Sequence, residues 1–181
     1  MKVVNRTIAL AFLSGFATHA VGTVTPPENL AEQQVAAKLH YINQQEVTLV
    51  EEVIQRTENK EVKEFAQMLK QEHETADAKL KAVVEKLGLS LVEYVPQTEE
   101  EKAAFEACKA QVAKLKTLQG KEFDIEFLQI MITEHEQGIS WLQTVAATVQ
   151  AEECQSFLTE LVTVFTKHAT EAKKLLAQIQ Q

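Results

Sequence analysis

The stretch LQIMITEHEQGISWL, residues 128–142, carries the pattern that decides the fold. Leu128, Met131, Gly138 and Leu142 recur in steps of three and four residues, the spacing of a helix face that is buried against an apolar core. His135 lies in the middle of that face. Burying an imidazole there costs free energy unless its polar atoms are paired, so we expect partners from other helices.

Three further segments show the same apolar stripe, and each has one polar residue near its middle. These segments are residues 30–57 with Glu46, residues 60–87 with His73, and residues 151–179 with His168. Each is about 28 residues long, which makes a helix of about 42 Å. Counted from the turns that join the helices in pairs, all four interruptions lie near mid-height. We therefore expect them to meet in one layer, with Glu171 one turn beyond His168 at its edge.

The fold class predicted from these stripes is all-α. The 5 Gly and 3 Pro are few, and helix-forming residues dominate the composition. Gly88 should end the second helix, and Thr98 with Glu101 should form a capping box that opens a third helix ending near Gly120. Two last helices should follow, over residues 121–150 and 151–179. Because the third helix is about long enough to run back along the bundle, the pattern predicts a ferritin-like four-helix bundle of two antiparallel hairpins, joined by an additional crossover helix.

The N-terminus reads as a secretory signal peptide, residues 1–20. Lys2 and Arg6 precede an apolar run, and small residues favour cleavage near Ala20. Residues 21–29 read as a disordered leader and residues 30–181 as the bundle. No later apolar stretch approaches about 20 residues, so no transmembrane segment is expected in the mature chain, which should be soluble and periplasmic or secreted. The net charge of −8 argues against binding nucleic acid.

The two cysteines, Cys108 and Cys154, leave a disulfide open, because an oxidising compartment permits one but the spacing does not indicate one. Protein partners, including a second copy of the chain, are also left open by the sequence.

Two motifs resemble a known family. VKEFAQMLKQEH, residues 62–73, is similar to a VKxFAxxMxxDH signature, and Gly120, Phe123, Asp124, Phe127, Leu128, Met131 and His135 match a second signature without a gap. Both are typical of a ferritin-like family of exported bacterial proteins of unknown function, often labelled "predicted outer membrane protein". A final helix with a central histidine, here His168, completes the resemblance. It implies the bundle fold and little about activity.

The polar layer predicts a metal site. Three imidazoles and a carboxylate suit one Zn, Fe, Cu or Ni ion, and helix bundles build such sites from facing side chains. The candidate ligands are Glu46, His73, His135 and His168, with Glu171 as a fifth ligand or a supporting partner. Asp77, four residues after His73, could hold the other ring nitrogen of that histidine. The ion would be buffered, stored or sensed.

Two other interpretations remain. The layer could bind no metal and only fix the register of the helices, as buried polar groups do in coiled coils, in a structural or interaction protein of the cell envelope. A ferritin-like metal-dependent oxidase is less favoured, because di-iron sites use Glu-x-x-His pairs. Lys70, Ile132 and Phe165 stand three residues before the three histidines instead.

Overall fold

The computed structural model describes residues 30–181, which form five helices. These are α1 (Leu30–Arg56), α2 (Lys60–Lys86), α3 (Glu99–Thr117), α4 (Gly120–Ala146) and α5 (Glu152–Ile179). No strand occurs in this part of the chain, so the predicted all-α class is confirmed. Among these helices, none has a stretch apolar enough to cross a membrane. The expected signal peptide and leader, residues 1–29, lie outside the described residues.

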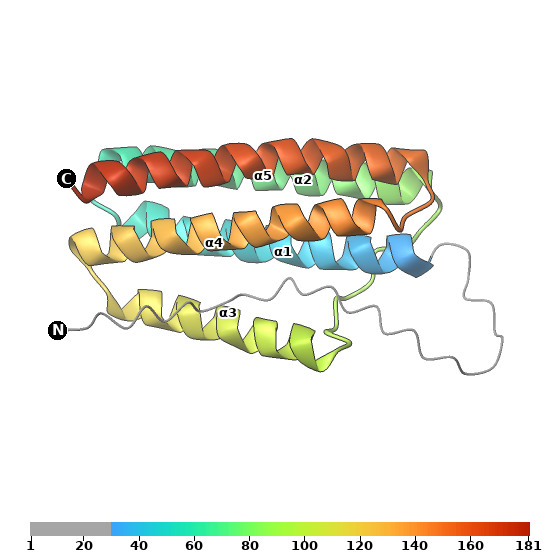
Figure 1. Ribbon diagram of the computed structural model, residues 1–181, viewed down its shortest axis with the longest axis horizontal. Coiled ribbons are helices and arrows are strands. Elements are labelled where there is room, and N and C mark those ends of the chain that lie inside the picture. The colour runs from blue at the N-terminus through green and yellow to red at the C-terminus, as the bar shows by residue number, and fades with distance from the viewer. Residues whose placement is uncertain (1–29) are drawn as a thin grey trace.

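Four of the helices form a bundle of two hairpins, as expected (Figure 1). Helix α1 packs against α2, and α4 packs against α5. Helix α3 lies beside the bundle, next to α4, and carries the chain from the end of α2 back to the beginning of α4 (Figure 1). The predicted crossover helix is therefore present, and α2 and α4 point in the same direction.

Local sequence signals explain where the helices begin and end. Asn59 caps α2 by accepting a hydrogen bond from the backbone N–H of Val62, and Thr98 caps α3 in the same way. Gly88, with φ of 65°, ends α2 in a Schellman motif in which the N–H of Leu89 donates to the carbonyl of Val84. These predicted boundaries are confirmed to within a few residues.

Gly120 differs from the prediction. It was expected to end the third helix, but α3 ends at Thr117 and Gly120 is the first residue of α4. Its φ of 54° is a left-handed conformation that glycine adopts at little cost, and it turns the chain after the extended Leu118. The glycine was identified correctly as a breaker and assigned to the wrong helix.

The apolar core is divided into two clusters. One contains Leu39, Leu80 and Leu142, and the other contains Leu69 and Leu128, with neighbours from all four bundle helices. Between these clusters along the helices lie the buried polar residues of the mid-bundle, which are Asn43, Glu46, His73, His135 and His168. The expected polar layer at mid-height is therefore present.

The buried face of α5 differs in phase from the predicted stripe. Glu171 was expected at the edge of the polar layer, but Ala172 is buried there and Glu171 is partly exposed. Two turns earlier, Phe165 is likewise buried and Val164 partly exposed. The face continues from Leu161 by a step of four instead of three, which the 3.6-residue period allows at any turn. This shift removes Glu171 from the polar layer.

Candidate metal centre

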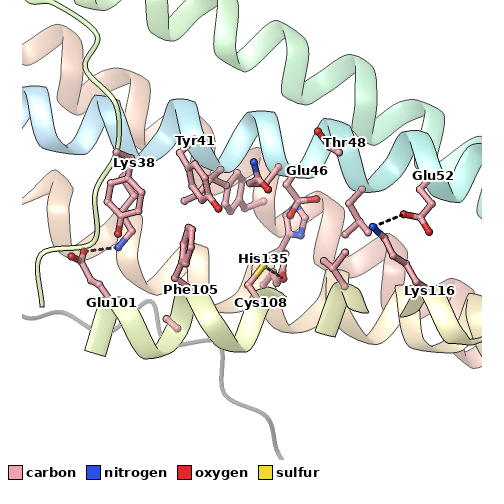
Figure 2. Close-up of a pocket in the computed structure, with 18 residues that line it drawn as sticks. Lys38, Tyr41, Glu46, Thr48, Glu52, Glu101, Phe105, Cys108, Lys116 and His135 are labelled. Atoms are coloured by element: carbon pink, nitrogen blue, oxygen red, sulfur yellow. Dashed lines mark hydrogen bonds and ion pairs between the residues drawn. The ribbon is translucent and has the colours of Figure 1, made fainter. Parts of the chain in front are cut away.

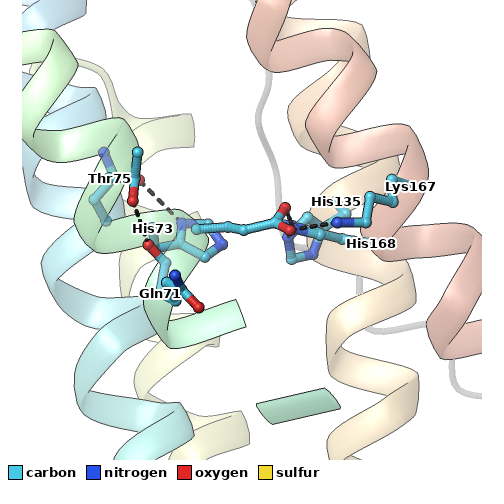
Figure 3. A network of polar contacts seen from close by, with 8 residues as sticks. Gln71, His73, Thr75, His135, Lys167 and His168 are labelled. Atoms are coloured by element: carbon cyan, nitrogen blue, oxygen red, sulfur yellow. Dashed lines mark hydrogen bonds and ion pairs between the residues drawn. The ribbon is translucent and has the colours of Figure 1, made fainter. Parts of the chain in front are cut away.

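Three histidines from three helices meet in the polar layer. One nitrogen from each of His73 (α2), His135 (α4) and His168 (α5) lies within 4.8 Å of the other two. The ring centroids are 4.9 to 5.7 Å apart, and the side chains are at most 2 % exposed. Figure 3 shows the three rings between the helices, with Lys167 at the outer end of the network. Three buried imidazole nitrogens this close together form a group that could hold a metal ion.

Each ring has an oxygen atom against its other nitrogen. His73 Nδ1 lies 3.0 Å from Oδ1 of Asn43, and His135 Nδ1 donates to the carbonyl of Met131 at 2.8 Å. His168 Nε2 lies 2.9 Å from a carboxylate oxygen of Glu72, which also binds Lys167. An amide oxygen, a backbone carbonyl and a carboxylate all accept hydrogen bonds. They therefore favour the tautomers in which the inward nitrogens carry lone pairs.

The protons in this network do not suffice for its contacts. His168 Nδ1 lies 3.0 Å from His135 Nε2, so the chain of contacts runs from the carbonyl of Met131 through both rings to Glu72. Both ends of the chain only accept, and three contacts need three protons. Two neutral imidazoles carry only two. His73 donates no proton to this chain of contacts, because its Nε2 has no hydrogen-bond partner. The network is one positive charge short.

An additional proton on one of the imidazoles would supply that charge, but burial disfavours the protonated form of each ring. Burial lowers the pKa of His73 well below its usual value and that of His135 to about 3, and the neighbouring imidazoles add to both shifts. The pKa of His168 is also lowered by burial, although Glu72 opposes the shift. For Glu72, burial raises the pKa, but Lys167 and His168 outweigh it and the net shift is downward. Glu72 is therefore a carboxylate that orients His168.

The other predicted site residues lie elsewhere. Glu46 is buried but hydrogen-bonds the side chain of Glu134, and it is not in the group formed by the three histidines. Glu171 pairs with Lys174 at 2.9 Å on a partly exposed face of α5. Asp77 binds His40 Nδ1 at 2.6 Å instead of His73.

Sequence reasoning missed the residues that orient the rings. Asn43 lies four residues after the core residue Leu39. A helix face can continue by a step of three or of four residues, so allowing both steps at this point would have placed Asn43 on the buried face. Glu72 directly precedes His73 on α2 yet binds His168, and no pattern in the sequence indicates that contact. Glu134 precedes His135 and likewise gave no signal of its pairing with Glu46.

The chain belongs to the family described as "Domain of unknown function (DUF4142)", whose model matches residues 18–175. This membership confirms one part of the resemblance found in the sequence, namely that the chain belongs to a family of unknown function. No protein of curated function matches the chain.

Two solved structures share the fold. One is a Streptomyces coelicolor protein described as "putative secreted protein DUF305", with a TM-score of 0.70, 19% identity, and coverage of 85% of this chain and 96% of that one. The other is a DUF305 fragment from Deinococcus radiodurans, with a TM-score of 0.71, 18% identity, and coverage of 84% and 99%. At this identity the likeness concerns the fold alone.

Proposed function

We propose that the protein binds a single transition metal ion between His73, His135 and His168, and that it buffers, stores or senses that ion. The observation that carries the proposal is the missing positive charge in the hydrogen-bond network. An ion on the three inward lone pairs supplies it, and each outer N–H then donates to its own oxygen. Outer oxygens of this kind are what fix imidazole ligands around metals.

The donor set limits the kind of ion. Neutral imidazoles suit Zn²⁺, Cu²⁺, Ni²⁺ and Fe²⁺, whereas Mg²⁺ and Ca²⁺ prefer oxygen. Three protein ligands also leave a coordination position for water or another small ligand. No Glu-x-x-His pair accompanies these histidines, so a di-iron oxidase is not the function that we propose.

The test is metal binding by the purified protein and four variants. After treatment with a chelator, each is titrated with Zn²⁺, Cu²⁺, Ni²⁺ and Fe²⁺, and the bound metal is measured by elemental analysis. We expect one ion per chain in the native protein, and none in His73→Ala, His135→Ala or His168→Ala. His40→Ala is the matched control and should retain the ion, because His40 binds Asp77 away from the site.

Two results would overturn the proposal. One is a protein that none of the four ions loads, and the other is stoichiometric metal in the His135→Ala variant. The first result would favour a layer that only sets the register of the helices. Circular dichroism of each variant separates lost ligands from lost folding.

We also propose that the protein acts after export, either in the periplasm or outside the cell. The support is the signal peptide expected over residues 1–20, together with a structural neighbour described as secreted. The relation to ferritins stays a prediction from the arrangement of the hairpins. Mass spectrometry of the mature N-terminus would test export, since we expect it to begin near Val21.

A further inference from the structure

A second site lies under α3. A cavity of about 160 Å³ opens between α1, α3 and α4 (Figure 2). It exists because α3 packs loosely on the bundle, with only Gln111 and Leu115 buried along its length. Most of its walls are aromatic or aliphatic, and they include Tyr41 and Phe105, whose ring centroids are 5.6 Å apart.

One end of the cavity is acidic. Glu46 from α1 and Glu134 from α4 hydrogen-bond each other through their side chains, and Cys108 from α3 lies with its sulfur 3.9 Å from Oε1 of Glu134. Figure 2 shows Glu46, Cys108 and His135 gathered at this end. Glu46 is only 6% exposed, and its Oε2 has no hydrogen-bond partner. A buried acceptor without a donor is costly, so the site lacks a donor group.

We infer that this cavity binds a small organic ammonium ion, with its nitrogen on Glu46 and Glu134 and its apolar body against Phe105 and Tyr41. Two carboxyl groups hydrogen-bond each other only when one of them carries a proton, so Glu46 and Glu134 together hold at most one negative charge, which one ammonium ion would match. The ammonium N–H groups would also supply the donor that Oε2 of Glu46 lacks. Aromatic rings along the wall also favour a cation. The other charged groups at the rim are already paired, as Lys38 is with Glu101.

Other ligand classes fit less well. In the described chain, the three histidines are the only group of three potential ligands close enough for a metal ion, so Cys108 and the two carboxyl groups do not form one. An anion would face two acidic side chains, and a hydrocarbon would leave Oε2 of Glu46 unpaired. Because a protein cavity of about 150 Å³ holds benzene, the ligand should have roughly six to eight non-hydrogen atoms.

The probe is benzylammonium chloride, titrated into the chelator-treated protein by calorimetry, so that occupancy of the histidine site does not enter. Benzyl alcohol, which has the same shape and no charge, is the control ligand. We expect benzylammonium to bind at least about tenfold more tightly than benzyl alcohol. Glu46→Gln should remove that preference. Glu51→Gln, which changes an exposed glutamate of the same helix that pairs with Lys70, should keep it.

A second measurement places the ligand. Cys108 lines the cavity, whereas Cys154 is buried in the core of the bundle. Benzylammonium should slow alkylation of Cys108 and leave that of Cys154 unchanged. The inference is overturned if neither ligand binds saturably, if both bind equally well, or if Cys108 is not protected. None of these results affects the metal proposal.

Discussion

Gly138 allows Phe165 to pack against the histidine layer, and replacing it with alanine tests that packing. A Cβ atom at this position would lie 2.6 and 2.7 Å from two ring carbons of Phe165. The ring cannot move freely, because it is 5% exposed and its centroid is 4.9 Å from that of His135. Contacts this short are overpacked and typically cost about 1–3 kcal/mol.

The helix itself favours the substitution. Alanine stabilises a helix interior by about 1 kcal/mol relative to glycine, so the net loss in Gly138→Ala should be up to about 2 kcal/mol. In a Phe165→Leu background the ring is absent, so the clash between it and the new Cβ atom at position 138 is absent as well. There the same change at Gly138 should be neutral or stabilising. The coupling energy between the two positions should therefore be about 1–3 kcal/mol.

The assay is urea unfolding of the native protein, both single variants and the double variant at 25 °C, with linear extrapolation to water. Chelator in every sample removes any contribution from bound metal. Effects that add to within about 0.5 kcal/mol would refute the reasoning, since they would mean that Phe165 does not limit the space at Gly138.

Three further predictions concern single groups. Burial raises the pKa of Glu101, but backbone N–H groups and the Lys38 ammonium outweigh burial and hold that pKa below its usual value. Glu101 therefore stabilises the fold above about pH 4.5, and this stabilisation is lost as the pH falls through the pKa of the folded state. The difference in stability between the native protein and Glu101→Gln, measured by urea unfolding, should shrink over that range, and a constant difference would contradict it. Burial raises the pKa of Cys108 to about 12, so iodoacetamide at pH 8 should react with it roughly a thousandfold more slowly than with an unfolded-chain thiol, and an equal rate in a stopped-flow or mass assay would contradict this. Asn59→Ala removes the acceptor for the N–H of Val62 and should lower the free energy of unfolding by about 1 kcal/mol in thermal or urea unfolding. An unchanged free energy of unfolding would contradict this role of the cap.

Whether the two cysteines pair could be decided only from the structure. Their spacing left a disulfide open, and in the structure both are free thiols, Cys108 on α3 and Cys154 at the beginning of α5. Cys154 packs with the core cluster that contains Leu80, and Cys108 faces Glu134 across the cavity. Pairing of distant residues depends on how helices are placed, which no local pattern encodes.

Helix positions were predictable because their signals are local. Gly88 and Thr98 act on the backbone within a few residues, and the structure uses both as expected. The level of the histidines was predictable for a similar reason, since distance along a helix is fixed at about 1.5 Å per residue. Rotation about the helix axis is less constrained, and a single step of four in place of three moved Glu171 out of the layer.

Side-chain pairing was the least predictable level. Asp77 lies on the helix that carries His73, but it binds His40 on α1 and also Lys81, so two other partners hold its carboxylate away from His73. Glu72 takes the role expected of Asp77, for His168 instead of His73. In each case the partner lies on another helix, and a rotamer rather than a sequence interval brings the atoms together.

The orientation of the rings argues for more than helix register. Register needs only one polar contact that would be broken by a slip of the helices, as a single buried asparagine provides in coiled coils. Here three rings are each turned by a separate acceptor, on Asn43, on the backbone at Met131 and on Glu72. The result is three lone pairs directed at one place and a buried Nε2 of His73 without a partner, which a layer serving only register would have no reason to leave. The cation that we propose would remove both costs at once, and the acceptors around the rings would hold its imidazole ligands in place.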